Sequence, residues 1–256
     1  MNLKTNDYTI IALTIISIIA SIGTPRVSQP LSYYDFADQR QLTLKIPNFF
    51  DVVSNTGFLV VGIIGIMVSF DKNTYFEDDR ERWPYAVFFI GMILTSIGSS
   101  YFHLHPNTER LFWDRLPMTI AFMSLIAAQV ADRISIDMGL VLLAPLLFIG
   151  AASVVYWLKT ERKGVGNVVP YAILQGYAVI VLLLITWLYP SRYTRGNDLY
   201  LVFIAYALAK ALETFDKGVF TVGQHILSGH TLKHIAATVA GGIVIRMLHL
   251  RRKQVK

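Results

Sequence analysis

Five polar side chains have the types and the spacing of a metal-dependent hydrolytic site. His230 and His234 lie four positions apart in the segment GHTLKH, so a helix places both imidazoles on one face. His103 ends the segment SIGSSYFH, and Ser99 lies one helical turn before it. Asp114 opens the next apolar segment, in LFWDRLPM. Three imidazoles leave one open position on a tetrahedral Zn²⁺ ion, which is the arrangement of a catalytic zinc site.

These residue types would supply the parts of a hydrolase. Zinc lowers the pKa of its bound water to about 7 and polarises a carbonyl group. Asp114 could carry the proton of that water, and the Ser99 hydroxyl could donate to an oxyanion. Each residue also has a simpler interpretation, because interfacial histidines bind headgroups, a membrane serine bonds its own backbone, and Asp114 could pair with Arg115. The residues alone leave both interpretations open.

The segments that must position these residues are long and apolar. Of 256 residues, 54% are apolar and 16% are charged, whereas soluble domains contain roughly 25% charged residues. Eight segments approach the length of about 20 residues that a membrane span needs: 8–23, 48–70, 84–104, 111–131, 137–158, 167–189, 198–215 and 229–249. The sequence predicts an all-α integral membrane protein with a single transmembrane domain over residues 1–256.

The composition also excludes several classes of function. The absence of cysteine excludes disulfides, iron–sulfur clusters and cysteine-based zinc sites. The net charge is +6, which in so apolar a chain indicates membrane topology rather than nucleic-acid binding. We therefore expect membrane lipids as partners, and neither nucleic acid nor an obligate protein partner.

The first segment and the distribution of charge bear on topology. Residues 8–23 could be a signal peptide, but Asp7 beside Lys4 weakens a positive n-region and no A-x-A site follows, which favours a retained helix. Loops on the side of both termini carry a modest excess of Lys and Arg, strengthened by the tail RRKQVK. We expect both termini in the cytoplasm and the histidines toward the outer side.

The ordered motifs resemble the alkaline ceramidase family. They are S-x-x-x-H before YFHLHP, the Asp of WDRLPM and H-x-x-x-H in SGHTLKH, together with ADQRQLTLKIPNFFDVVSN and YALAKALETFD. That family belongs to the CREST superfamily of membrane hydrolases, and the chain looks closest to its bacterial ceramidase-like members. The resemblance covers about residues 34–248. A bacterial inner membrane is the location that it implies.

The resemblance implies a fold, a metal and a reaction. The fold would be a seven-helix CREST-type bundle over residues 48–249, with 8–23 as an extra N-terminal helix. Zinc would bind His103, His230 and His234, while Ser99 would assist the oxyanion and Asp114 would handle the proton. The reaction would be hydrolysis of ceramide, or a ceramide-like N-acyl lipid, to a fatty acid and an amine.

A calcium site is a further candidate, because eukaryotic alkaline ceramidases carry one before the first core helix. Its ligands here would be Asp35, the Phe36 carbonyl, Asp38 and Asn48. Arg40 argues against it, since it falls near the position of a neutral oxygen ligand and a guanidinium opposes a cation. In the alternative, Arg40 pairs with Asp35 or Asp38 and makes calcium unnecessary.

Other polar residues near the predicted site are candidates for supporting roles. Asp51, Ser54 and Asn55 form a polar patch at i, i+3 and i+4, for which interhelical hydrogen bonding is favoured over direct catalysis. Glu213 and Asp216 could orient a zinc-bound imidazole or could be solvated helix ends.

Two other functions remain open. One is a non-catalytic CREST-type receptor or structural protein that keeps the metal site. The other is a metal- or proton-coupled transporter, although the sequence shows neither the internal repeats nor the paired broken helices common in that class. Ceramide is not the only substrate that fits, since another N-acyl lipid is as plausible.

Overall fold

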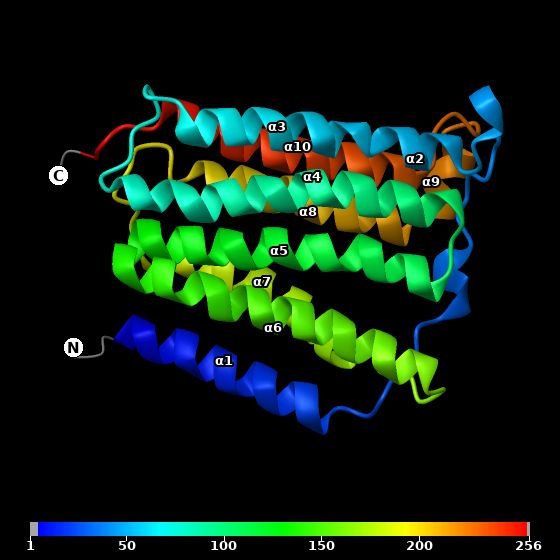
Figure 1. The fold of residues 1–256 in the computed structure, drawn as a ribbon, viewed down its shortest axis with the longest axis horizontal. Helices are drawn as coiled ribbons and strands as arrows, with labels where there is room; N and C mark the ends of the chain where they lie inside the picture. Colours follow the sequence, from blue (N-terminus) through cyan, green and yellow to red (C-terminus); the bar gives the residue numbers. More distant parts are fainter. Residues whose placement is uncertain (1–4, 255–256) are drawn as a thin grey trace.

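The described part of the chain, residues 5–254 of the computed structural model, folds into helices that run alongside one another (Figure 1). The helices are α1 (Thr5–Gly23), α2 (Phe49–Ser54), α3 (Thr56–Phe70), α4 (Arg82–Leu104), α5 (Thr108–Arg133), α6 (Ile136–Arg162), α7 (Val169–Leu188), α8 (Asp198–Thr214), α9 (Asp216–Val222) and α10 (Gly229–Leu250). Three short 3-10 helices lie between them: η1 (Leu31–Tyr34), η2 (Thr43–Lys45) and η3 (Asp79–Glu81). The described residues form no strand, which confirms the all-α prediction.

The described helices are also those of a multi-pass membrane protein. Seven of them, with α2 and α3 counted as one, are long and apolar enough to cross a membrane. Each of the eight predicted segments contains a helix. The segment 198–215 forms α8, whose 17 residues fall just short of a typical span. The largest boundary difference is at α6, which continues through Lys159 to Arg162, and the unpredicted helix α9 follows α8.

The segment 48–70, predicted as one helix, is broken at Asn55. The Asn55 side-chain amide donates to the Asp51 carbonyl oxygen (2.7 Å), and the Asn55 backbone N–H donates to Val52 instead (3.3 Å). Ser96 Oγ on α4 donates to the Asn55 carbonyl at 2.7 Å. Asparagine competes with the helical backbone for hydrogen bonds, so a buried Asn55 divides α2 from α3.

The arrangement of the helices places the predicted site residues near one end of the bundle. α10 packs against both α3 and α8, while α4 lies between α3 and α5. The start of α1 and the end of α10 share one end (Figure 1), and the end of α4 and the starts of α5 and α10 lie at the other. α1 packs on α7, where Thr14 Oγ1 lies 2.9 Å from the Tyr177 hydroxyl. Lys4 and Lys256, which entered the charge comparison, lie outside the described residues.

Candidate active site

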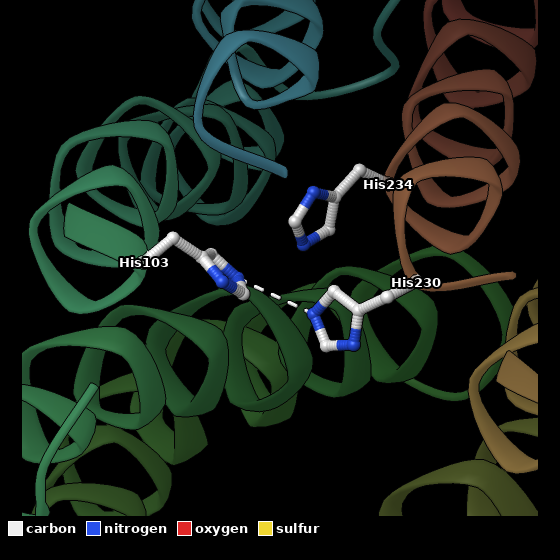
Figure 2. Close-up of side chains that lie close together, drawn as sticks. All are labelled: His103, His230 and His234. Atoms are coloured by element: carbon white, nitrogen blue, oxygen red, sulfur yellow. Dashed lines mark hydrogen bonds between the residues drawn. The ribbon is translucent and has the colours of Figure 1, made fainter. Parts of the chain in front are cut away.

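Three imidazoles meet in the interior of the bundle. Figure 2 shows His103 from α4 and His230 and His234 from α10 pointing toward one another. The Nε2 atoms of His103 and His230 are 3.3 Å apart. One ring nitrogen from each residue lies within 4.8 Å of the others. All three side chains are buried, His103 completely.

The cluster fits a zinc ion. A tetrahedral ion with Zn–N bonds of about 2.0–2.1 Å holds two nitrogens about 3.4 Å apart, and the observed 3.3 Å matches this separation. Ser54 Oγ lies 2.8 Å from His234 Nδ1, which leaves His234 Nε2 free to face the other rings. Among residues 5–254, this is the one group of three or more His, Cys, Asp or Glu side chains close enough to share an ion.

The first turn of α10 is fixed from two sides. Ser228 Oγ accepts the Thr231 backbone N–H at 2.9 Å and caps the helix. Asp216 Oδ1 accepts the His230 backbone N–H at 2.7 Å, and its other oxygen accepts the Ala37 N–H at 2.9 Å. The carboxylate of Asp216 therefore ties α10 to the segment before α2, and it contacts the backbone of His230 rather than its ring.

Ser99 and Asp114 are brought together by the close approach of α4 and α5. A Cβ atom on Gly98 would lie 1.9 Å from the Trp113 carbonyl oxygen, so only glycine permits this approach. The neighbouring side chains of Ser99 and Asp114 interact with each other, and both are buried. Arg115 also acts on Asp114 through its charge, but no ion pair within 4.0 Å joins the two side chains in the described structure.

An apolar cavity of about 290 Å³ begins at these residues. Ser99, Asp114 and His234 line its polar end together with Arg115, Lys210, Glu213 and Lys233. Its remaining wall comes from α3, α4, α5, α7, α8 and α10, with side chains such as Phe58, Met92, Leu125, Val202 and Ala240. A second hollow, of about 510 Å³, lies beside His230 and is lined by residues of η1 and α9. An acyl chain in the first cavity would place its polar end beside the imidazoles.

The two carboxylates predicted to bind calcium, Asp35 and Asp38, each pair with a different basic side chain. Asp38 accepts the Nε of Arg40 at 2.7 Å and its Nη2 at 2.6 Å, and Arg40 also donates to the Ile226 carbonyl. Lys217 donates to Asp35 at 2.5 Å, and this ammonium holds the pKa of the Asp35 carboxyl below its ordinary value. The pairing of Arg40 with Asp38 is the alternative to calcium that the sequence suggested.

Phe36 and Asn48 instead support the histidines. The Phe36 ring packs on both imidazoles, with its centroid 4.7 Å from those of His103 and His230. The Asn48 side-chain amide donates to the His103 carbonyl oxygen at 2.8 Å and so holds the end of α4.

The polar patch Asp51, Ser54 and Asn55 joins α2 to the first turns of α10 through its Asp51 and Ser54 side chains. Asp51 accepts hydrogen bonds from the Thr231 hydroxyl at 2.6 Å and from the Ser228 hydroxyl at 3.3 Å. Ser54 contacts the His234 ring, and Asn55 makes the helix break described above. The favoured interpretation of this patch, interhelical hydrogen bonding, describes Asp51, while Ser54 orients an imidazole directly.

Lys233 is a site residue that the sequence analysis missed. Its ammonium lies 2.9 Å from His230 Nε2 and 3.2 Å from Glu213 Oε1. Glu213 also pairs with Lys210, so it contacts two lysines and no imidazole. If an ion were bound by the three histidines, Lys233 would lose its contact with His230 Nε2 and would pair with Glu213 alone. The position of Lys233 between two histidines was the available signal, but a lysine at a membrane depth usually extends to the interface.

Comparison with known families gives one match. The model of the family described as Ceramidase matches residues 39–253. The chain belongs to the Ceramidase family. The matched range contains all three histidines, Ser99 and Asp114, and it begins just after Asp35, Phe36 and Asp38. No curated protein matches the chain. Membership supports a ceramidase-type amide hydrolase that acts on lipid.

Proposed function

We propose that this protein is a zinc-dependent amidase that cleaves the N-acyl bond of ceramide or a ceramide-like lipid, releasing a fatty acid and an amine. The observation that carries the proposal is the buried group of three imidazoles at the polar end of an apolar cavity. The cavity offers an acyl chain a dry environment, and the imidazoles stand where its carbonyl would lie. Family membership supports the same reaction class.

The histidines would hold the metal through their Nε2 atoms. His234 is oriented for this by Ser54, and His103 and His230 by the ring of Phe36. Zinc, when bound, supplies Lewis acidity that polarises a carbonyl and makes water more acidic. A partner on the second ring nitrogen fixes the orientation of an imidazole ligand, which is the role that we assign to Ser54.

Asp114 and Ser99 would handle proton and charge. Hydrolysis joins the oxygen of water to the acyl carbon, breaks the C–N bond and transfers one proton to the departing amine. The Asp114 carboxylate takes a proton from the attacking water and returns it to the amine nitrogen. The Ser99 hydroxyl donates a hydrogen bond to the oxygen that becomes negative during attack. Their mutual contact keeps both groups at the same wall of the cavity.

The orientation that we propose puts the site on the outer side of a bacterial inner membrane, with both termini in the cytoplasm. Its support is that the start of α1 and the end of α10 lie at the end of the bundle away from the histidines (Figure 1), and that loops at this end carry the modest excess of basic residues.

The test is metal content measured together with turnover. Elemental analysis of the detergent-purified protein should give one zinc per chain, and a panel of N-acyl lipids should release fatty acid. A His230→Ala/His234→Ala variant should lose both zinc and hydrolysis. His225→Ala is the matched control, because His225 packs on Phe220 outside the cluster.

The outcomes separate the competing functions. Zinc without hydrolysis of any N-acyl lipid would favour a non-catalytic membrane protein that keeps the metal site. Hydrolysis that persists in the double variant would overturn the assigned roles of the histidines.

A further inference from the structure

We propose that Arg115 makes the cavity select N-acyl lipids with an acidic group on the amine side of the amide, such as N-acyl amino acids, over neutral ceramide. The inference rests on the proposed amidase function. Arg115 has no part in the proposed hydrolysis itself, and its position bears on the chemical class of the substrate.

Arg115 is a buried cation on the wall of the cavity. The residue is 5% exposed, and its Nη2 donates to the Gln29 side-chain oxygen at 2.6 Å. Its Nη1 is buried and has no hydrogen-bond partner in the described part of the chain. The guanidinium carbon lies 5.4 Å from the ring centroid of Tyr33, 4.3 Å from that of Trp157 and 4.8 Å from that of Tyr171. The aromatic rings hold the guanidinium in place without neutralising it.

No carboxylate of the described chain forms an ion pair with this guanidinium. Asp114 interacts with Ser99 and also acts on Arg115 through its charge, but no ion pair within 4.0 Å joins Asp114 to the guanidinium. Glu161 accepts the Gln29 backbone N–H at 2.7 Å and the Trp157 indole N–H at 3.2 Å. Glu213 is shared by two lysines. A buried charge that lacks a counter-charge in direct contact is costly, and arginine does not lose its proton in proteins. Arg115 therefore has the capacity to bind an anion in direct contact, which no carboxylate of the described chain provides.

The surrounding charges favour the same kind of ligand. The polar end of the cavity carries three cations, Arg115, Lys210 and Lys233, against the two carboxylates of Asp114 and Glu213. Glu213 contacts both lysines and can balance only one of them, so the polar end of the cavity keeps a net charge of one positive unit.

The position of Arg115 indicates which part of the substrate it meets. Arg115 follows Asp114 directly in α5 and lines the same cavity, so it lies beside the reacting groups. Gln29 and Tyr33, which contact it, belong to the segment on the outer side of the bundle. The apolar wall takes the acyl chain. A group near Arg115 therefore lies on the amine side of the scissile bond, where an amino acid would carry its carboxylate.

The test compares two substrates that differ only in charge. N-Oleoylglycine has a carboxylate, and N-oleoylglycinamide replaces it with a neutral amide of the same shape. Release of oleate from each by the purified protein gives the ratio of kcat/KM for acid over amide. We expect a ratio of at least about tenfold, the scale of one hydrogen bond to a charged group. Ceramide should be cleaved less efficiently than the acid. A wild-type ratio of one or below would overturn the proposal.

Variants assign the preference to Arg115. Arg115→Gln should lower the acid-to-amide ratio by about tenfold or more, while Arg115→Lys should retain part of it because the charge remains. Arg110→Gln is the matched control, since Arg110 lies on the same helix but stacks on Tyr101 outside the cavity. A merely structural arginine would affect both substrates alike, so an unchanged ratio in folded Arg115→Gln would refute the assignment. If that variant does not fold, Arg115→Lys and the wild-type comparison still decide.

A binding measurement separates this proposal from the amidase function. If neither compound is hydrolysed, thermal unfolding of the wild-type protein with each compound still reports affinity. Greater stabilisation by the acid than by the amide would support the charge selection although the amidase function had failed, and equal stabilisation would contradict it. Phosphatidylglycerol in the micelles distinguishes the source of the anion. If it abolished the preference, Arg115 would be a site for bilayer phospholipid and the proposal would be wrong.

Discussion

Replacement of Gly98 by alanine should disable the site without touching any of its polar groups. The added Cβ would lie 1.9 Å from the Trp113 carbonyl oxygen, whereas ordinary contacts begin at 3.4 Å. The obstructing atom belongs to the backbone of α5, so relief requires the two helices to separate by about 1.5 Å, the difference between these distances. Ser99 moves with α4 and Asp114 with α5, so their contact is lost.

The expected loss follows from that displacement. A misplacement of about 1 Å in an active site can cost about 100-fold in rate, so Gly98→Ala should lower kcat/KM by at least about 100-fold. Forcing one methyl group into a packed interface typically costs about 1–3 kcal/mol of stability. Zinc should remain, because His103 is on α4 and the other two ligands are on α10, and neither belongs to the displaced α5.

The assay combines fatty acid release, zinc content and thermal unfolding in detergent. Gly242→Ala is the matched control: Gly242 is also helical, and a Cβ there meets no atom within 4 Å. That variant should keep wild-type activity. Gly98→Ala with wild-type turnover would refute the reasoning, because it would show that the approach of α4 to α5 does not set the position of Ser99 against Asp114.

Three further predictions concern the support of the site. Ser54→Ala should weaken zinc binding by about 10- to 100-fold in chelator competition, because His234 loses the partner of its Nδ1; unchanged zinc affinity would contradict this role. Ser99→Ala should reduce kcat by about 100- to 1000-fold while zinc content stays at the wild-type level, and a variant that keeps full kcat would exclude the hydroxyl as the oxyanion donor. Calcium should not raise the thermal unfolding temperature of the wild type, because the Arg40 guanidinium already pairs with both carboxylate oxygens of Asp38. Stabilisation by calcium would show that the ion binds beside this pair.

Much of the site could be predicted because its chemistry lies in local spacing. The H-x-x-x-H motif places His230 and His234 on one helical face, and the number of spans between helices places His103 at the same level. The apolar segments gave the helices to within a few residues, since the membrane leaves few alternatives to them. The break at Asn55 was not predicted, because it depends on a hydrogen bond from Ser96 on another helix.

The rest depends on contacts between residues far apart in the chain. Lys233 reaches Glu213 only after α8 and α10 have packed together. The interaction of Asp114 with Ser99, which lies on another helix, depends on the close approach of α4 and α5 at Gly98. Phe36 covers the imidazoles because Asp216 holds the adjacent backbone, a contact that spans 179 positions. No local pattern of residue types encodes such distances.

The distribution of the three histidines along the chain has a consequence for biosynthesis. His103 lies on α4, and its first partner follows 127 positions later, on the last helix described. A ribosome completes α4 through α8 before it makes either residue of α10, so a nascent chain carries one imidazole and no cluster. Capture of the proposed metal would then come after insertion of α10, and the ion would join the last described helix to the middle of the bundle. A chain truncated before Gly229 would still insert several spans but would lack two of the three imidazoles and so could not bind the proposed ion. Cells starved of metal would accumulate full-length protein that is inserted but inactive.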